Sequence, residues 1–133
     1  MRIGSVVLLS NQHCIQSYHW QIYRPLGPLQ TVMDSHEEYQ CDEVAIIRPI
    51  RDDDCIENFK KDLEVLRSLK TMTPVSFGGG IRNMEHLELL VDLPIERLVF
   101  TTAFLNKDRS FLNEAKALFG HQAIQCLLPL VKN

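Results

Sequence analysis

A short apolar strand, a turn of three glycines and the start of a helix follow one another in the segment Thr73-Pro74-Val75-Ser76-Phe77-Gly78-Gly79-Gly80-Ile81-Arg82. Glycine adopts positive φ without steric cost, so such a turn can bring backbone N–H groups close to an anion. The N-terminus of the following helix would add to the attraction. The same spacing is typical of a tight turn with close packing, so the segment predicts a strand–turn–helix unit with two alternative roles.

Helices are predicted where apolar residues recur every three or four positions. The first such segment covers residues 54 to about 70, where Asp54 and Glu57 form a capping-box-like start. The second covers residues 108–119 and stops at Gly120. Weaker helical patterns cover residues 28–40 and, opening on a capping Asn83, residues 83–93.

Short, continuously apolar and β-branched runs lie between these helices and predict strands buried on both faces. They cover residues 3–9, 43–47, 74–77, 95–102 and 123–130. Residues 13–23, where aromatic and polar side chains alternate, predict a hairpin after the first strand. Strands and helices therefore alternate regularly, which predicts an α/β fold with a parallel sheet and right-handed crossovers.

We interpret the whole chain, residues 1–133, as a single domain of four βα units plus a fifth strand. A closed eight-unit barrel takes about 250 residues, so this chain can supply only half of one. An open, doubly wound sheet of the flavodoxin type has the same length and strand count. Periodicity alone does not separate the half-barrel from that alternative.

The composition indicates a soluble, cytoplasmic globular protein. Of the residues 45% are hydrophobic, and 14 Lys and Arg against 17 Asp and Glu give a net charge of −3, whereas a nucleic-acid-binding protein is normally basic. No apolar run reaches the length that spans a bilayer, and none reads as a signal peptide. The cysteines are far apart and the histidines share no ligand spacing, so we expect no metal and no cofactor.

Candidate site residues follow the predicted strands, because ligands of parallel α/β folds bind at the carboxyl ends of the strands. The glycines Gly78, Gly79 and Gly80 are the first candidates for binding a phosphate group. Thr101 and Thr102 end the neighbouring strand, where their hydroxyl groups could complete the anion site or simply end a strand. Arg48 ends the second main strand, and an arginine there could hold a phosphate or carboxylate.

The glycine segment, together with residues 96–103 (Glu-Arg-Leu-Val-Phe-Thr-Thr-Ala), resembles the cyclase subunit of imidazole glycerol phosphate synthase. The resemblance extends over essentially the whole chain and covers the N-terminal half of that enzyme plus its fifth strand. It implies a (β/α)₈-type barrel and therefore favours the half-barrel. It also implies phosphate ligands at Gly80, Thr101 and Thr102, with Thr101 standing where the family has Asn.

The same resemblance implies that the family's catalytic residues are missing. Its two general acid/base aspartates correspond to Leu8 and Pro129, and neither of these side chains can transfer a proton. A family lysine corresponds to Gln16 and a further aspartate to Arg48. Cyclisation by the family's route is therefore not expected, and whether the chain is an enzyme stays open.

Charged residues begin three of the predicted strands. Arg2, Glu43 and Arg97 match the family's charged gate at the bottom of the barrel, where ammonia enters from a glutaminase partner. Opposite charges at strand starts would also satisfy one another in a purely structural cluster. Both interpretations predict that the three side chains lie together.

Half a barrel leaves apolar strand edges unpaired, and such edges need a partner. A second copy is the simplest partner, so we expect a homodimer or higher homo-oligomer; a fragment of a longer protein is the alternative. Three functions stay open: binding of a phosphorylated small molecule, an altered lyase or ammonia-using synthase, and a non-catalytic dimerising module or evolutionary remnant. We expect neither nucleic acid nor a membrane as a partner.

Overall fold

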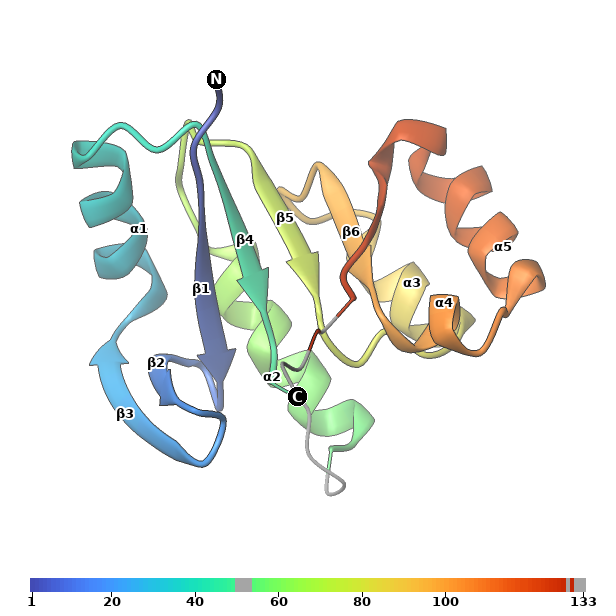
Figure 1. Cartoon of the computed structure of the whole chain (residues 1–133), viewed down its shortest axis with the longest axis horizontal. Coiled ribbons are helices and arrows are strands. Elements are labelled where there is room, and N and C mark those ends of the chain that lie inside the picture. Colours follow the sequence, from blue (N-terminus) through green and yellow to red (C-terminus); the bar gives the residue numbers. More distant parts are fainter. Residues whose placement is uncertain (50–53, 129, 131–133) are drawn as a thin grey trace.

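A computed structural model describes residues 1–49, 54–128 and 130 of the chain (Figure 1). The strands are β1 (Gly4–Ser10), β2 (His13–Tyr18), β3 (Ile22–Gly27), β4 (Glu43–Ile47), β5 (Val75–Gly78), β6 (Arg97–Phe100) and β7 (Ile124–Cys126). The helices are α1 (Leu29–Glu38), α2 (Ile56–Arg67), α3 (Met84–Leu90), α4 (Thr102–Leu105) and α5 (Arg109–Phe119), and a 3₁₀ turn covers His121–Ala123.

All seven strands form one sheet in the order β3-β2-β1-β4-β5-β6-β7. Strands β1, β4, β5, β6 and β7 are parallel neighbours, whereas β2 and β3 add to β1 as an antiparallel hairpin. Each of the first four parallel strands is followed by at least one helix. The prediction of four βα units plus a fifth strand is therefore confirmed, as is the hairpin.

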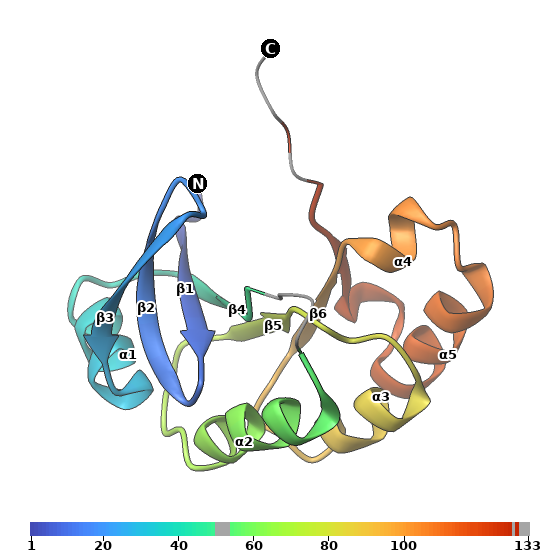
Figure 2. The same ribbon diagram turned by 90° about the horizontal axis from the view of Figure 1, so that it is seen from below.

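The helices α2, α3 and α5 cover the convex side of the sheet, which curves away from them (Figure 2). Such curvature, with helices outside and the concave face inside, is the geometry of a TIM-type barrel. The chain is half of such a barrel, and this excludes the flavodoxin-type alternative, in which helices cover both faces.

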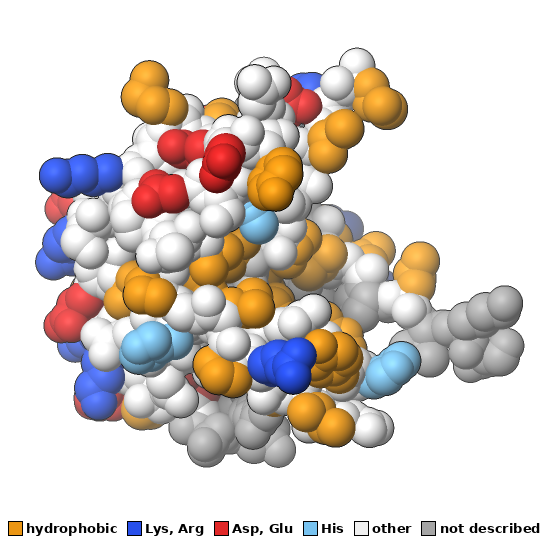
Figure 3. Space-filling view, turned by 90° about the vertical axis from the view of Figure 1, so that its left-hand side faces the viewer, with side chains coloured by type: hydrophobic (Ala, Val, Ile, Leu, Met, Phe, Trp, Pro, Cys, Tyr) orange, Lys and Arg blue, Asp and Glu red, His pale blue; other side chains and the backbone are white. Residues whose placement is uncertain are grey.

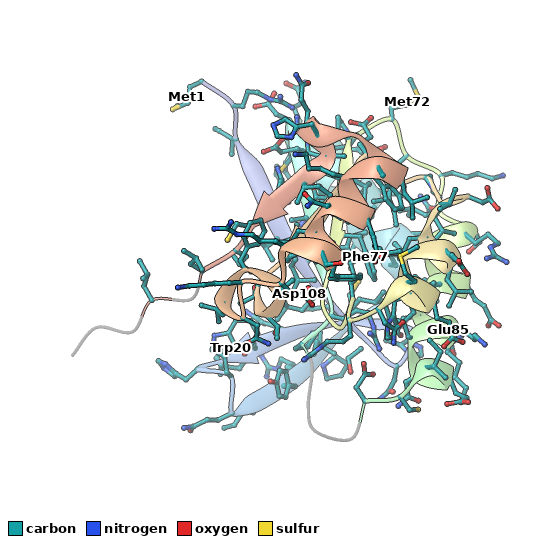
Figure 4. The ribbon with its side chains drawn as sticks, turned by 90° about the vertical axis from the view of Figure 1, so that its right-hand side faces the viewer. Met1, Trp20, Met72, Phe77, Glu85 and Asp108 are labelled. Carbon is teal, nitrogen blue, oxygen red and sulfur yellow. The ribbon has the colours of Figure 1, made fainter. Side chains whose placement is uncertain are left out.

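The core lies between the sheet and these helices because alternate strand residues point toward the helices. The parallel register aligns Ile46 with Phe77 and Phe77 with Leu98, and all three are fully buried. Figure 4 shows Phe77 in the interior and Asp108 at the start of α5. On α2 the buried side chains include Phe59, and burying such a residue contributes roughly 1.5–3 kcal/mol.

Helix ends agree with the sequence patterns at two of the three predicted signals. Asn83 caps α3 by accepting from the His86 N–H, and Gly120, with φ +94°, ends α5. The capping role predicted for Asp54 is wrong: Cys55 is the N-cap of α2 and makes no side-chain cap. Both carboxylate oxygens of Asp54 instead accept hydrogen bonds from the Arg48 guanidinium. A buried, charged guanidinium is a stronger donor than a helix N–H that water can reach.

The edge of the sheet beside β1 is only partly covered. The hairpin pairs with Leu8–Ser10 and leaves the earlier part of β1 without a strand partner on that side. Val6 is 66% exposed there, and hydrophobic side chains gather around a hollow between β1, the hairpin and α1 (Figure 3). Within the part of the chain that the structure describes, no helix has the length and apolar character to cross a membrane.

Candidate functional site

A cavity of about 290 Å³ opens at the carboxyl ends of β5 and β6, where the sequence predicts the anion site. Its wall includes Gly79, Gly80, Arg82, Thr101 and Thr102. Gly80 and Thr101, which lie 21 positions apart in the chain, therefore meet at one cavity. Gly78 ends β5 just below it.

The three glycines are required for different reasons. Gly78 lies so close to β6 that a Cβ there would be 2.6 Å from the Val99 carbonyl oxygen. Gly79 has φ +104°, and a Cβ there would overlap the Arg48 carbonyl oxygen. Gly80 has φ +81° and forms the cavity wall. The turn is thus tightly packed, and no described residue accepts a hydrogen bond from the Gly80 N–H.

The two threonines differ in their contacts. The Thr101 hydroxyl donates to the Leu127 carbonyl oxygen at 2.7 Å and so ties β6 to the segment after β7. The strand β6 ends at Phe100, before the two threonines that the sequence predicts as its end. Thr102 instead begins α4 and is half-buried, and its hydroxyl has no partner elsewhere in residues 1–49, 54–128 and 130. Of the pair, only the Thr102 hydroxyl is therefore ready to bind a ligand.

Arg48 directly follows β4 and is buried together with Asp62, whereas its other partner, Asp54, is partly exposed. Its Nε donates to Asp62 at 2.8 Å, and its Nη2 donates to Asp54 at 2.8 Å. Its Nη1 donates to the Gly79 carbonyl oxygen at 3.2 Å and to Asp54 at 3.4 Å. The guanidinium also lies 4.9 Å from the centre of the Phe59 ring. An anion-binding role for Arg48 stays a prediction, and these contacts favour a structural role.

Sequence reasoning missed Asp62, which is 3% exposed on α2. It lies three positions after Phe59 and four before Leu66, so a carboxylate on the apolar face of a predicted helix was the available signal. The Asp62 Oδ2 accepts from Arg48, and its Oδ1 accepts from the Gln12 N–H at 2.7 Å. A buried carboxylate needs such partners, and finding it on an apolar stripe predicts a buried cation nearby.

A second cavity, of about 330 Å³, lies beside Arg48 toward the hairpin. Its wall includes Asn11 and Tyr23 from the hairpin region and Asn58 and Asp62 from α2. Arg48 also lines the first cavity and thus separates the two. The sequence does not predict that the hairpin lines this cavity, because no local pattern determines which strand the hairpin pairs with.

His86 anchors the far end of the glycine turn. Its Nδ1 is 3.4 Å from the Arg82 backbone nitrogen, which donates to it, and its ring packs edge-on against Phe59 at 4.6 Å. Burial lowers the pKa of His86 below its usual 6.5, because the charged imidazolium loses its hydration. The neutral imidazole that accepts this hydrogen bond is therefore favoured.

The structure brings the predicted cluster at the amino ends of the strands together. Glu43 Oε2 lies 3.2 Å from Arg2 and 3.5 Å from Arg97. All three side chains are at least one-third exposed. Their mutual neutralisation accounts for the arrangement, and a role as a gate stays a prediction.

Leu8 pairs with Ile47 of β4 and with Ile15 of the hairpin, and Gln16 lies in the hairpin opposite Arg24. Pro129 lies outside the described residues. In the described ranges, no three His, Cys, Asp or Glu side chains are grouped so that they could hold a metal ion. The titratable groups described at the carboxyl ends of β4 and β5 include those of the Arg48 cluster, Arg82 and His86.

The amino-acid sequence is similar to those of known proteins. Two relatives carry the name "Putative imidazole glycerol phosphate synthase subunit hisF2": one from Vibrio vulnificus is 24% identical over 99% of this chain, and one from Campylobacter jejuni is 28% identical over 94%. An imidazole-4-carboxamide isomerase from Clostridium acetobutylicum is 26% identical over 80% of the chain.

The chain spans about half the length of these curated relatives, with 48%, 49% and 45% of each covered. This share agrees with the half-barrel that the sheet topology shows. The profile described as histidine biosynthesis protein matches residues 28–128, from the start of α1 to the segment after β7. The chain therefore belongs to the histidine biosynthesis protein family.

Proposed function

We propose that this protein binds a phosphorylated small molecule, with the phosphate group in the cavity between the glycine turn and Thr102. The observation that supports this most is the convergence, on one cavity wall, of hydrogen-bond donors that no described residue satisfies. The Gly80 N–H has no described acceptor, the Thr102 hydroxyl has no described partner, and Arg82 supplies a positive charge. Phosphate oxygens accept hydrogen bonds from such groups.

The relatives' names agree with this chemistry. The name of the relatives from Vibrio vulnificus and Campylobacter jejuni contains a phosphate ester, imidazole glycerol phosphate. A half-barrel that keeps the cavity of β5 and β6 would retain the phosphate-binding part of such a site. The proposal transfers only this chemical class of ligand to the present chain.

We further propose that the protein does not catalyse cyclisation by a route that uses two aspartates. The resemblance puts Leu8 and Pro129 at the corresponding positions, and neither has an ionisable side chain. An altered lyase or ammonia-using synthase chemistry would need other residues. The carboxylates near the cavity, Asp54 and Asp62, are held by Arg48 rather than free to act as bases.

The test is calorimetric titration of the protein with inorganic phosphate and with phosphosugars. Wild-type protein is expected to bind, and Gly80→Asp is expected to abolish binding, because it adds a negative charge and strain at φ +81°. Gly27→Asp is the matched control: Gly27 also has positive φ, +113°, but lies at the end of the hairpin with open space around it. Absence of binding by the wild-type protein, or equal loss in both variants, would overturn the proposal.

A second function, self-association, is favoured by the open edge of the sheet. Val6 in β1 and Leu128 beyond β7 are 66% and 55% exposed, so exposed apolar side chains lie at both edges of the parallel part of the sheet. We propose that a second copy covers these edges, since exposed apolar edges otherwise promote aggregation. Light scattering over a dilution series is expected to give twice the chain mass of 15.3 kDa, and a monomer at every concentration would exclude a homodimer.

A further inference from the structure

Arg48 contacts the glycine turn at two consecutive carbonyl groups. Its backbone N–H donates to the Gly78 oxygen at 2.9 Å, and its Nη1 donates to the Gly79 oxygen at 3.2 Å. The Arg48 carbonyl group in turn fills the space beside Gly79 that a Cβ would occupy. Arg48, directly after β4, thus contacts the glycine turn through both its backbone and its side chain.

The guanidinium has little capacity left for a ligand. Of its five N–H groups, four are directed at Asp54, Asp62 and the Gly79 carbonyl group. The two carboxylates outweigh its charge by one unit, so the cluster as a whole does not attract an anion. Direct binding of phosphate by Arg48 would require breaking these buried ion pairs.

A planar peptide links the Arg48 contact to the cavity. The Gly79 carbonyl group and the Gly80 N–H belong to one trans peptide unit, so they point in opposite directions. A hydrogen bond that holds the Gly79 oxygen on Arg48 therefore turns the Gly80 N–H away from Arg48. Glycine at both positions lets this peptide rotate easily, so an external contact is needed to fix it.

The carboxylates fix Arg48 in turn. Asp62 is itself held by the Gln12 N–H, and the Phe59 ring lies against the guanidinium. Asp54 binds through both carboxylate oxygens just before α2 begins. The turn after β1 and helix α2 therefore position Arg48, and Arg48 positions the glycine turn.

We infer that Arg48 is a positioning residue, which orients the Gly80 N–H for phosphate and does not itself bind the phosphate. This inference rests on the proposed phosphate binding at the same cavity. Its alternative, Arg48 as a direct ligand, predicts the opposite response when a carboxylate is neutralised. Freed from Asp54, a ligand arginine would bind phosphate more tightly, whereas a positioning arginine would lose its orientation.

The decisive variant is Asp54→Asn, titrated with inorganic phosphate by calorimetry at several KCl concentrations. Positioning predicts affinity about tenfold weaker than wild type, since a charge-assisted hydrogen bond is lost. Arg48→Lys keeps the charge but lacks the planar fork that contacts Asp62, Asp54 and Gly79 at once, so it is expected to weaken binding similarly. Asp34→Asn, at an exposed acid on α1, controls for the change in net charge and should bind as wild type.

Tighter binding by Asp54→Asn, or full affinity in Arg48→Lys, would overturn the inference while leaving phosphate binding intact. No binding by the wild-type protein would overturn both proposals. A ligand-free measurement tests the orientation directly: ¹⁵N relaxation of the Gly80 amide, followed by NMR, is expected to show motion of larger amplitude in Asp54→Asn than in wild type. Equal relaxation in the two proteins would also contradict the inference.

Discussion

The two ends of the parallel strands carry charge clusters of mirrored composition. At the carboxyl ends, one arginine, Arg48, lies between two aspartates, with ion pairs of 2.8 Å and side chains of Arg48 and Asp62 only 4% exposed. At the amino ends, one glutamate, Glu43, lies between two arginines at 3.2 and 3.5 Å, all at least one-third exposed. Burial, rather than the number of charges, distinguishes the two.

This difference decides what each cluster contributes. A buried charge that loses its partner costs several kcal/mol, whereas an exposed pair is screened by water and salt. The buried cluster is therefore suited to fix the geometry of the glycine turn. The exposed cluster can rearrange at small cost, and it neutralises the start of the sheet without defining a rigid site.

The largest effect is expected when the buried cluster loses Asp62. Asp62→Ala leaves Arg48 and the Gln12 N–H without that carboxylate, and we expect a loss of about 3–5 kcal/mol in unfolding free energy, measured by urea denaturation. Glu64→Ala, at an exposed acid on the same helix, should cost about 0.5 kcal/mol or less. Similar losses of unfolding free energy in both variants would mean that burial does not account for the effect of Asp62.

Two glycine substitutions compare the packing at the two ends. Gly79→Ala places a Cβ against the Arg48 backbone at positive φ, and we expect a loss of about 3 kcal/mol. Gly4→Ala places a Cβ 2.9 Å from Glu43 Cγ, where a flexible, partly exposed side chain can move aside, so we expect less than about 1 kcal/mol. Thermal and urea unfolding measure both, and a larger loss for Gly4→Ala would contradict the comparison.

A pH dependence is expected at the buried end through His86. Its pKa is lowered in the folded protein, so the unfolded chain takes up a proton first as the pH falls below about 6.5. The stability contributed by neutral His86 is complete above that pH and is lost as the pH falls toward the lower folded pKa. His86→Phe should show a shallower decrease in urea midpoint between pH 7.5 and 5, and an identical decrease would exclude His86 as the cause.

The smallest effect is expected at the exposed end. Glu43→Gln removes the shared partner of Arg2 and Arg97, and we expect a loss below about 1 kcal/mol at low salt. Because salt screens exposed charges, the difference from wild type should vanish near 1 M NaCl. A difference that persists in 1 M NaCl would show that this cluster behaves like the buried one.

The sequence predicted the candidate site at the level of segments but not of atoms. Gly80 and Thr102 were predicted together, because strand ends of a parallel sheet meet at one edge, and the structure places both on one cavity. Arg48 was predicted as an anion ligand, although its guanidinium is held by Asp54 and Asp62. The partner of a buried charge depends on which helix packs over it, and no local pattern reports that.

Local chemistry in the sequence determined the order of the elements and all helices but the short α4, where a strand was predicted up to Thr102. The strand composition, the apolar spacing of α2 and α5, and the stop at Gly120 all act within a few residues. Tertiary structure decided the rest, namely the pairing of the hairpin with β1, the clamp on Arg48 and the exposure of Val6 at an open edge. The physical reason is that these features depend on burial and contacts between distant segments. These contacts, and the stabilisation they give, form only once the sheet has assembled.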